Sequence, residues 1–158
     1  MNNIYCKDQE KTEKLGYLLG KLLGDGDVLC LSGDLGAGKT CLAKAISTVL
    51  GVSPQDVNSP TFSLMNIYKG KTLEIKHFDL YRLNSAAELE DIGFSEFAGN
   101  SGVTLIEWGE LFAGELPEEY LNVKIIKEDD GRRIFLEPYG SHYKEICEKV
   151  WKLVNAGN

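Results

Sequence analysis

The chain has 158 residues, of which 43% are hydrophobic and 26% are charged, values close to those of globular proteins. This composition excludes a disordered, collagen-like or coiled-coil chain, and the length predicts a single domain over residues 1–158. The formal net charge is −7, so the chain has no overall positive charge with which to hold nucleic acid through counterion release. Any role on nucleic acid is therefore expected to run through a partner protein.

Short apolar runs and unpaired cysteines predict a cytoplasmic protein with no membrane span. The apolar runs at 28–31 and 103–106 are far shorter than the ~20 residues that cross a bilayer, and the first residues have no apolar export signal. Cys6, Cys30, Cys41 and Cys147 have no C-x-x-C spacing, so reduced thiols are expected. The apolar surroundings of Cys30 and Cys41 favour small core residues.

The first 50 residues predict a helix, a buried strand and a second helix. Leucines recur at helical spacing over residues 8–23, and Gly24 ends the pattern. Residues 27–31 form a continuous apolar run, which is typical of a strand buried on both faces. The helical period returns over residues 39–50 and stops at Gly51. A glycine-rich turn thus joins a buried strand to a helix.

The middle of the chain predicts a hairpin, a short helix and another buried strand. Residues 59–68 are extended, residues 69–71 reverse the chain, and residues 73–79 alternate apolar and polar side chains, which predicts a hairpin near a sheet edge. A capping-box spacing precedes a short helix over residues 85–92. Residues 103–107 repeat the continuous apolar pattern of a buried parallel strand.

The last 40 residues predict a second hairpin and a final helix. The hairpin joins residues 121–126 to residues 132–136 through an Asp-Asp-Gly turn, and the helix covers residues 143–153. The whole pattern predicts an α/β fold of the P-loop NTPase type. Its three layers would have a central, mainly parallel sheet to which antiparallel hairpin strands are added.

The glycine-rich turn carries the clearest chemistry in the sequence. Residues 33–40 read Gly-Asp-Leu-Gly-Ala-Gly-Lys-Thr, which satisfies the P-loop motif G-x-x-x-x-G-K-[ST], and they lie between a buried strand and a helix as that motif requires. These residues are called the P-loop below. Backbone amides of such a loop surround phosphate oxygens, the lysine reaches the β- and γ-phosphates, and the hydroxyl binds Mg²⁺. The residues expected to bind the nucleotide here are Gly33, Leu35, Gly36, Ala37, Gly38, Lys39 and Thr40.

Two carboxylates compete for the place beside Thr40 that a magnesium ion needs. Glu107 ends a continuous apolar run, which indicates burial in the sheet centre, whereas Asp79 follows an alternating strand, which indicates a half-exposed position. We favour Glu107 as the metal-side carboxylate. Asp79 would then position water or sense the γ-phosphate, or else cap a turn of the local backbone. Lys39, Asp79 and Glu107 are the candidate catalytic residues.

Other polar and aromatic residues carry weaker signals. Thr61, in Ser-Pro-Thr at 59–61, lies where nucleotide switches place a hydroxyl that reads the γ-phosphate. His77 is either a proton-transfer group or a hydrogen-bonded structural residue. Trp108 is expected to contact the core or a partner protein rather than to stack against a nucleic-acid base. A small basic edge is expected on the last hairpin, from Lys124, Lys127, Arg132 and Arg133.

Four segments together resemble one family. They are Gly-Asp-Leu-Gly-Ala-Gly-Lys-Thr at 33–40, Ser-Pro-Thr-Phe-Ser-Leu at 59–64, His-Phe-Asp-Leu-Tyr-Arg-Leu at 77–83 and Leu-Ile-Glu-Trp at 105–108. In this order they are similar to the TsaE (YjeE) family of small bacterial P-loop ATPases, which are needed to form threonylcarbamoyladenosine next to the anticodon of tRNA. The resemblance extends over about residues 11–136.

The resemblance implies ATP and Mg²⁺ as cofactors. It also implies an ATPase whose nucleotide cycle acts within a multi-protein tRNA-modifying complex. It implies that the P-loop and Lys39 bind ATP and that Thr40 and Glu107 bind Mg²⁺. Thr61, Asp79 and Trp108 would belong to a switch and partner face, expected around residues 61–64 and 79–83. It also implies Thr12 near the adenine and Arg132 at the nucleotide. The implied partners are TsaD-like and TsaB-like subunits, which would carry the tRNA.

Two other P-loop classes are disfavoured by the sequence. A small kinase usually surrounds its two phosphate groups with several arginines and a lid, whereas this chain has three arginines and no long lid insertion. A GTP-dependent switch would need a segment such as Asn-Lys-x-Asp to select guanine, and the sequence has none. ATP is therefore the expected nucleotide.

Overall fold

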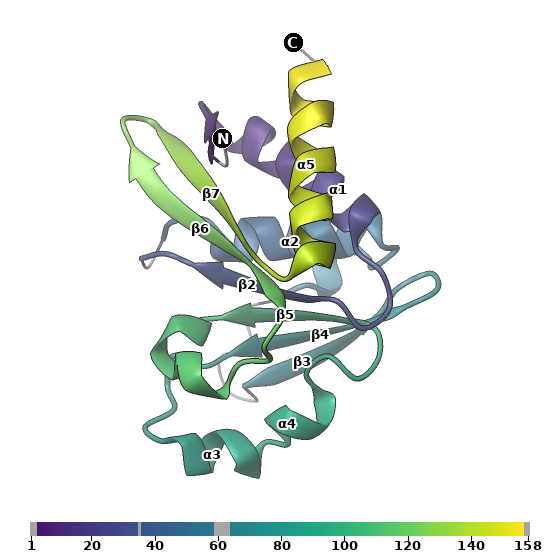
Figure 1. Cartoon of the computed structure of the whole chain (residues 1–158), viewed down its shortest axis with the longest axis vertical. Helices are drawn as coiled ribbons and strands as arrows, with labels where there is room; N and C mark the ends of the chain where they lie inside the picture. The colour runs from purple at the N-terminus through teal and green to yellow at the C-terminus, as the bar shows by residue number, and fades with distance from the viewer. Residues whose placement is uncertain (1–2, 35, 59–63, 157–158) are drawn as a thin grey trace.

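The computed structural model describes residues 3–34, 36–58 and 64–156, and its centre is a seven-stranded sheet in the order β1-β7-β6-β2-β5-β4-β3 (Figure 1). The strands are β1 (Asn3–Cys6), β2 (Val28–Ser32), β3 (Met65–Lys69), β4 (Glu74–Asp79), β5 (Val103–Glu107), β6 (Tyr120–Glu128) and β7 (Gly131–Tyr139). The helices are α1 (Gln9–Leu22), α2 (Lys39–Val49), α3 (Ala86–Asp91), α4 (Phe94–Phe97) and α5 (Ser141–Ala156), and two 3₁₀ segments are η1 (Pro54–Asp56) and η2 (Gly109–Glu115).

Four parallel strands form the middle of this sheet. β6, β2, β5 and β4 pair in parallel, while β3 pairs antiparallel with β4, β7 with β6, and β1 with β7. This arrangement confirms the predicted α/β fold, with a mainly parallel centre and antiparallel hairpin strands. It also confirms that the β3–β4 hairpin lies at a sheet edge. The edge strand β1 was not predicted, because four residues with mixed polarity carry no clear period.

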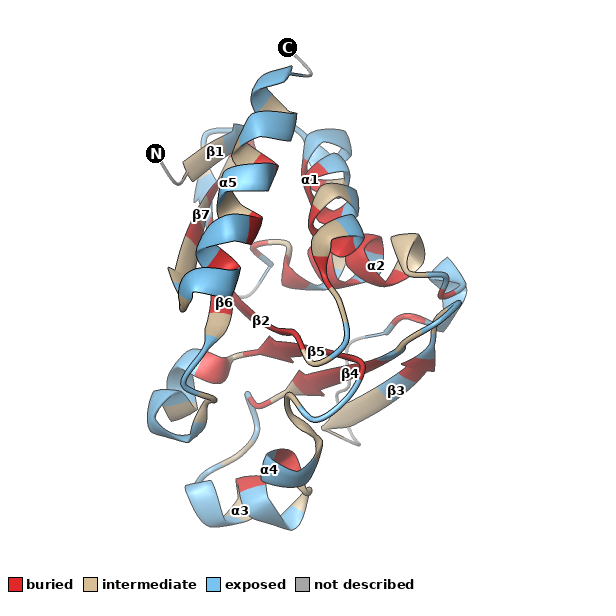
Figure 2. Cartoon of the chain, turned by 45° about the vertical axis from the view of Figure 1, so that its right-hand side comes forward, coloured by how far each residue is buried: buried red, intermediate tan, exposed pale blue. Residues whose placement is uncertain are grey.

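Helices cover both faces of the sheet, so the fold has three layers. α1, α2 and α5 lie on one face, and α3 and α4 lie on the other (Figures 1 and 2). The first hydrophobic cluster joins the three longer helices to one side of the strands, and the second joins Leu89 of α3 and Phe94 of α4 to Phe78 and Ile106 on the opposite side. Within the described ranges, no helix combines the length and apolar character that crossing a bilayer needs.

The helices α1 and α2 approach each other closely through two glycines. Asp8 caps α1 by accepting a hydrogen bond from the Lys11 amide at 3.0 Å, as the predicted start of this helix requires. A Cβ atom on Gly16 would lie 2.5 Å from Cβ of Ala45, and one on Gly20 would overlap the side chain of Val49. The absence of side chains at both glycines therefore lets α1 pack directly against the helix that begins at the P-loop.

The strand β4 differs from its prediction. Its alternating sequence predicted a half-exposed strand, but Ile75 to Phe78 are all buried, because the strand lies between β3 and β5 under helices on both faces. Its polar members have internal partners. The Lys76 amine donates to the Phe97 carbonyl at 2.8 Å, and the His77 ring is bonded at both nitrogens. The polar residues of this alternating strand are therefore buried and hydrogen-bonded, and they do not face solvent.

Candidate functional site

The P-loop connects the end of β2 to the start of α2, at the edge of the sheet where the parallel strands end. Gly33, Gly36 and Gly38 have φ values of 142°, 75° and 118°, in the region that favours glycine. Gly38 directly precedes the first residue of α2, so amide groups of the helix start face the loop. The predicted strand–loop–helix context of the motif is therefore present. Leu35, which was predicted to bind the nucleotide, lies outside the described residues.

The Lys39 amine is enclosed by the loop and by an aromatic ring. It donates to the Gly33 carbonyl and, at 3.1 Å, to the Asp34 carbonyl, and it lies 3.8 Å from the centre of the Trp108 ring. Burial lowers the pKa of Lys39, while the carboxylates of Glu110 and, more weakly, of other nearby acidic residues raise it. The positive charge is thus held beside the loop by carbonyl oxygens and the face of an indole ring.

Both competing carboxylates lie at this site. Asp79 and Glu107 are paired in register at the ends of β4 and β5, and both face a cavity of about 250 Å³. Its other lining residues are Gly36, Gly38, Lys39, Thr40, Cys41 and Trp108. Glu107 is buried, as predicted, and Asp79 is partly buried. Asp79 Oδ1 also accepts a hydrogen bond from the Tyr81 amide at 3.0 Å, which is the turn-capping contact considered above.

The donor set of this cavity fits magnesium. In nucleotide sites Mg²⁺ is usually bound by one or two carboxylates, waters and substrate phosphates rather than by a cage made only of protein groups. Thr40 supplies an exposed hydroxyl beside the two carboxylates of Asp79 and Glu107. All three groups present oxygen atoms, the ligand type that this hard cation prefers.

Thr12 and Arg132 line a second cavity that adjoins the first. It has a volume of about 230 Å³, and its other lining residues are Asp8, Gln9, Ala37, Gly38, Cys41, Asp130 and Gly131. Arg132 Nε donates to the Ala37 carbonyl at 2.6 Å, so a side chain of β7 is hydrogen-bonded directly to the P-loop backbone. Thr12 is buried and donates to the Asp8 carbonyl at 3.4 Å. Gly38 and Cys41 line both cavities, which places the two hollows side by side along the loop.

Two sequence expectations near these cavities need correction. Cys41 is not a core residue: it is partly exposed, because it lies on the side of α2 that faces the cavities, whereas Cys30 is buried as expected. The basic edge expected on the last hairpin is divided. Arg132 turns to the P-loop, and Arg133 pairs with Glu128 at 2.8 Å.

Glu110 also belongs to this site, although no sequence pattern predicted it. Its Oε2 accepts a hydrogen bond from the Gly33 amide at 3.4 Å, and its charge is the largest carboxylate influence on the pKa of Lys39. This placement depends on Trp108, whose positive φ of 64° turns the chain from β5 into η2. No residue pattern announces that turn, because Trp is not a residue that favours such a conformation.

The expected switch and partner face is described only in part. Thr61 and the rest of residues 59–63 lie outside the described residues. Trp108 and Tyr81 contact each other with ring centres 4.8 Å apart, and Tyr81 is half exposed. An aromatic pair is thus present beside Lys39 at the end of β5 and the turn after β4.

Comparisons with known proteins agree with one another. The family model described as "Threonylcarbamoyl adenosine biosynthesis protein TsaE" matches residues 6–135. Two curated proteins named tRNA threonylcarbamoyladenosine biosynthesis protein TsaE are similar to the chain. The one from Bacillus subtilis is 38% identical over 94% of this chain and 93% of its own length, and the one from Treponema pallidum is 40% identical over 80% and 93%. A crystal structure of Bacillus subtilis YdiB matches with a TM-score of 0.79 and 30% identity, covering 97% of this chain and 95% of that one.

Proposed function

The chain belongs to the TsaE family of tRNA threonylcarbamoyladenosine biosynthesis proteins, and on this premise we propose that it is a Mg²⁺-dependent ATPase whose nucleotide cycle serves that pathway. It would act through nucleotide-dependent contacts with TsaD-like and TsaB-like subunits in the cytoplasm. Those subunits would bind the tRNA, which this chain would contact only indirectly.

The observation that carries the proposal is the meeting of one amine, one hydroxyl and two carboxylates at the P-loop. Lys39, Thr40, Asp79 and Glu107 face the same cavity, and the adjoining cavity has Thr12 and Arg132 on its walls. The first cavity suits phosphates and a metal ion, and the second, at the other side of Gly38, suits the nucleoside. This arrangement supports a nucleoside triphosphate as the ligand.

Each residue would have a separate task in the reaction. The loop amides and the Lys39 amine would balance the phosphate charge, for which Lys39 would leave the carbonyls of Gly33 and Asp34. Thr40 and Glu107 would hold Mg²⁺, which when bound would neutralise charge on the phosphate oxygens. Asp79, with one oxygen on the Tyr81 amide, would orient the attacking water. Arg132 would keep the loop in its binding shape.

ATP hydrolysis measured with and without the partner proteins tests the proposal. We expect phosphate release that requires Mg²⁺, that rises when TsaD-like and TsaB-like proteins are added, and that is lost in Lys39→Ala together with binding of a fluorescent ATP analogue. Lys44→Ala is the matched control, since Lys44 is exposed on the same helix. Circular dichroism should show that both variants fold.

Two results would contradict the proposal. Unchanged nucleotide binding and hydrolysis in Lys39→Ala would refute the assignment of the P-loop. Activity that does not respond to the partner proteins would favour an enzyme that works alone.

A further inference from the structure

Three polar side chains form a buried hydrogen-bonded chain across β3, β4 and β5. His77 Nε2 lies 2.5 Å from Glu107 Oε2, and His77 Nδ1 lies 3.0 Å from the Tyr68 hydroxyl. The sheet register explains the alignment. His77 pairs with Leu105 and with Asn66, so Glu107 and Tyr68 are each two residues further along a neighbouring strand, on the same face.

This chain of contacts is almost entirely buried. His77 is fully buried, and the exposed fractions of Glu107 and Tyr68 are 3% and 6%. Polar groups at such positions are costly unless each one has a partner, and a carboxylate more so than a neutral group. A core built only for stability would place apolar residues here, as Ile75 and Leu105 do on the same face of the same strands.

The hydrogen-bond donors and acceptors fix the orientation of Glu107. An ionised carboxylate only accepts hydrogen bonds, so Nε2 of His77 carries the proton of that contact. The Tyr68 hydroxyl has one hydrogen, which goes either to His77 Nδ1 or to the Asn58 carbonyl at 2.7 Å. A neutral ring that carries its proton on Nε2 has a bare Nδ1, so the contact with Tyr68 is a hydrogen bond when the hydroxyl donates to Nδ1, and that arrangement holds the ring at both nitrogens. One oxygen of Glu107 is thereby tied down, which leaves Oε1 as the oxygen for a metal ion.

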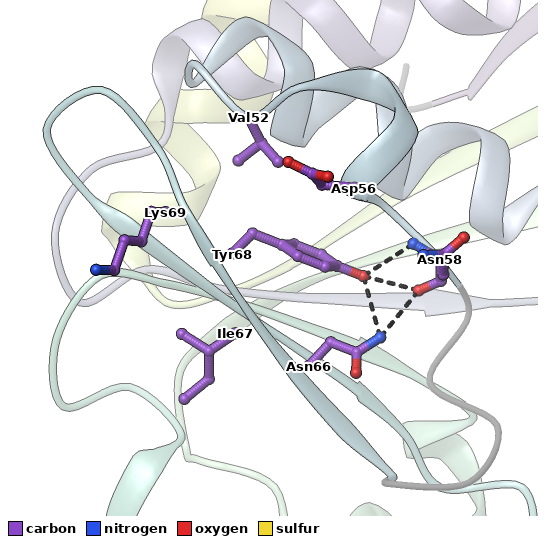
Figure 3. A pocket seen from close by; sticks show the side chains of 7 residues that line it. All are labelled: Val52, Asp56, Asn58, Asn66, Ile67, Tyr68 and Lys69. Carbon is purple, nitrogen blue, oxygen red and sulfur yellow. Dashed lines mark hydrogen bonds between the residues drawn. The ribbon is translucent and has the colours of Figure 1, made fainter.

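The outer end of the chain of contacts is anchored by two asparagines. Besides its contact with the Asn58 carbonyl, the Tyr68 oxygen accepts hydrogen bonds from the Asn58 amide at 3.2 Å and from Asn66 Nδ2 at 3.4 Å. Asn58, Asn66 and Tyr68 also line a separate surface cavity of about 530 Å³, and the Tyr68 hydroxyl points toward the two asparagines (Figure 3). The tyrosine is therefore fixed by backbone and side-chain groups outside the nucleotide site.

We propose that Tyr68 and His77 are positioning residues that hold Glu107 for metal binding. This inference rests on the proposed function, in which Glu107 binds Mg²⁺. Side chains that hydrogen-bond to a metal-binding residue typically set its orientation. Loss of such a side chain weakens metal binding about 10- to 100-fold. Neither Tyr68 nor His77 lines the cavity that contains Glu107, so both act through the carboxylate alone.

Binding of Mn²⁺ to the complex with ADP, followed by electron paramagnetic resonance, tests the inference without relying on turnover. We expect His77→Leu to weaken Mn²⁺ binding about 10-fold and Tyr68→Phe to weaken it less, about fivefold, since it removes one neutral hydrogen bond. Affinity for a fluorescent ADP analogue in the presence of a chelator should stay unchanged in both variants. His77→Gln, which restores an N–H group near the place of Nε2, should recover part of the Mn²⁺ affinity.

Matched controls separate positioning from a general loss of structure. His142→Leu and Tyr5→Phe alter the other histidine and another tyrosine, which bond to Asp27 and to the Glu128 carbonyl and line neither candidate cavity, and both variants should bind Mn²⁺ as the wild type does. If His77→Leu does not fold, Tyr68→Phe, which removes a single hydroxyl, still decides the question.

The possible outcomes distinguish this inference from the proposed function. If the wild type binds Mn²⁺ and ADP while Tyr68→Phe and a folded His77→Leu do so equally well, the positioning role is overturned and the proposed function stands. If the wild type binds neither, the proposed function fails and the positioning role fails with it.

Discussion

At the scale of single residues, Asp79 and Glu107 are close in space but differ in their surroundings. Glu107 is buried and tied to His77, whereas Asp79 is partly buried and contacts a backbone amide of the turn that follows it. A buried carboxylate with a fixed orientation suits a metal ligand, and one on a turn suits a group that moves with the phosphate. The same two strand ends thus offer two different chemical roles.

Substitution of these two carboxylates should separate the roles. We expect Glu107→Gln to raise the Mg²⁺ concentration needed for nucleotide binding, because a neutral amide is a weaker ligand. Asp79→Asn should leave that concentration nearly unchanged and slow hydrolysis. Titrations with Mg²⁺ at fixed nucleotide and steady-state rates at saturating Mg²⁺ measure the two effects. The reverse result would exchange the roles of the two residues.

Cys41 gives a second test at this scale, because it lines both candidate cavities. Burial raises the pKa values of Cys41 and, to about 11, of Cys147, so both thiols are mostly protonated at pH 8. Only the thiolate reacts, so alkylation by iodoacetamide should be slow and should accelerate as the pH rises toward each pKa. Bound Mg²⁺ and ADP should slow the reaction of Cys41 and leave that of Cys147 unchanged, as peptide mass spectrometry would show. Equal protection of both thiols would argue against a ligand in these cavities.

At the scale of elements, the contact between α1 and α2 determines how the P-loop helix is held. Gly16 and Gly20 have no side chains, so the backbone of α1 packs directly against the side chains of Ala45 and Val49 in α2. Gly16 and Gly20 contact the middle and the C-terminal end of α2. Because a helix is rigid, packing these parts of α2 against α1 also sets the position of its N-terminal turn. The position of Lys39 at the first turn of α2 thus depends on residues that are far from any ligand.

Enlarging these glycines should destabilise the fold. Gly16→Ala and Gly20→Ala each gain helix propensity, about 1 kcal/mol, but overpacking costs typically 1–3 kcal/mol, and the clash at Gly20 includes the Ile46 carbonyl at 2.9 Å. We expect a net loss of stability of about 1 kcal/mol for each, measured by urea denaturation. Gly24→Ala is the control, because a Cβ there meets nothing within 4 Å. If Gly16→Ala and Gly20→Ala were as stable as Gly24→Ala, the two helices could move apart without loss of folding free energy, which would contradict this prediction.

Elements with a strong local pattern could be predicted from the sequence, and contacts that depend on register could not. The continuous apolar runs of β2 and β5 and the helical period of α1 were read correctly. The short helix α4 and the segment η2 have too few residues for a period to show, and they begin at positive φ angles of Gly93 and Trp108. The bond between His77 and Glu107 joins residues 30 positions apart, so it follows from strand pairing alone.

At the scale of the whole molecule, acidic groups outnumber basic ones by 24 to 17, and several basic groups are already engaged. Lys39 and Arg132 contact P-loop carbonyls, Lys76 is buried, and Arg133 pairs with Glu128. Lys124 and Lys127 of β6 stay exposed, but acidic groups outnumber basic ones over the chain as a whole. The excess of negative charge is the reason why we propose only indirect contact with tRNA.

The isolated chain should accordingly bind tRNA weakly. We expect no gel shift with tRNA at physiological salt, and a shift only when TsaD-like and TsaB-like proteins are added. Comparison of ATP-loaded and ADP-loaded chain in the same assay would show whether the nucleotide alters that assembly. Tight binding by the chain alone that persists at high salt would contradict the proposed division of labour.

The two tryptophans of the chain lie in different optical environments. Trp108 lies under the Lys39 amine and against the Tyr81 ring, while Trp151 of α5 lines a groove with residues of β1 and α1. If Lys39 turned toward a phosphate, as proposed, the surroundings of the Trp108 ring would change, whereas Trp151 lines a different pocket and would keep its own surroundings. We therefore expect the intrinsic fluorescence of Trp108 to report on the P-loop without any added label.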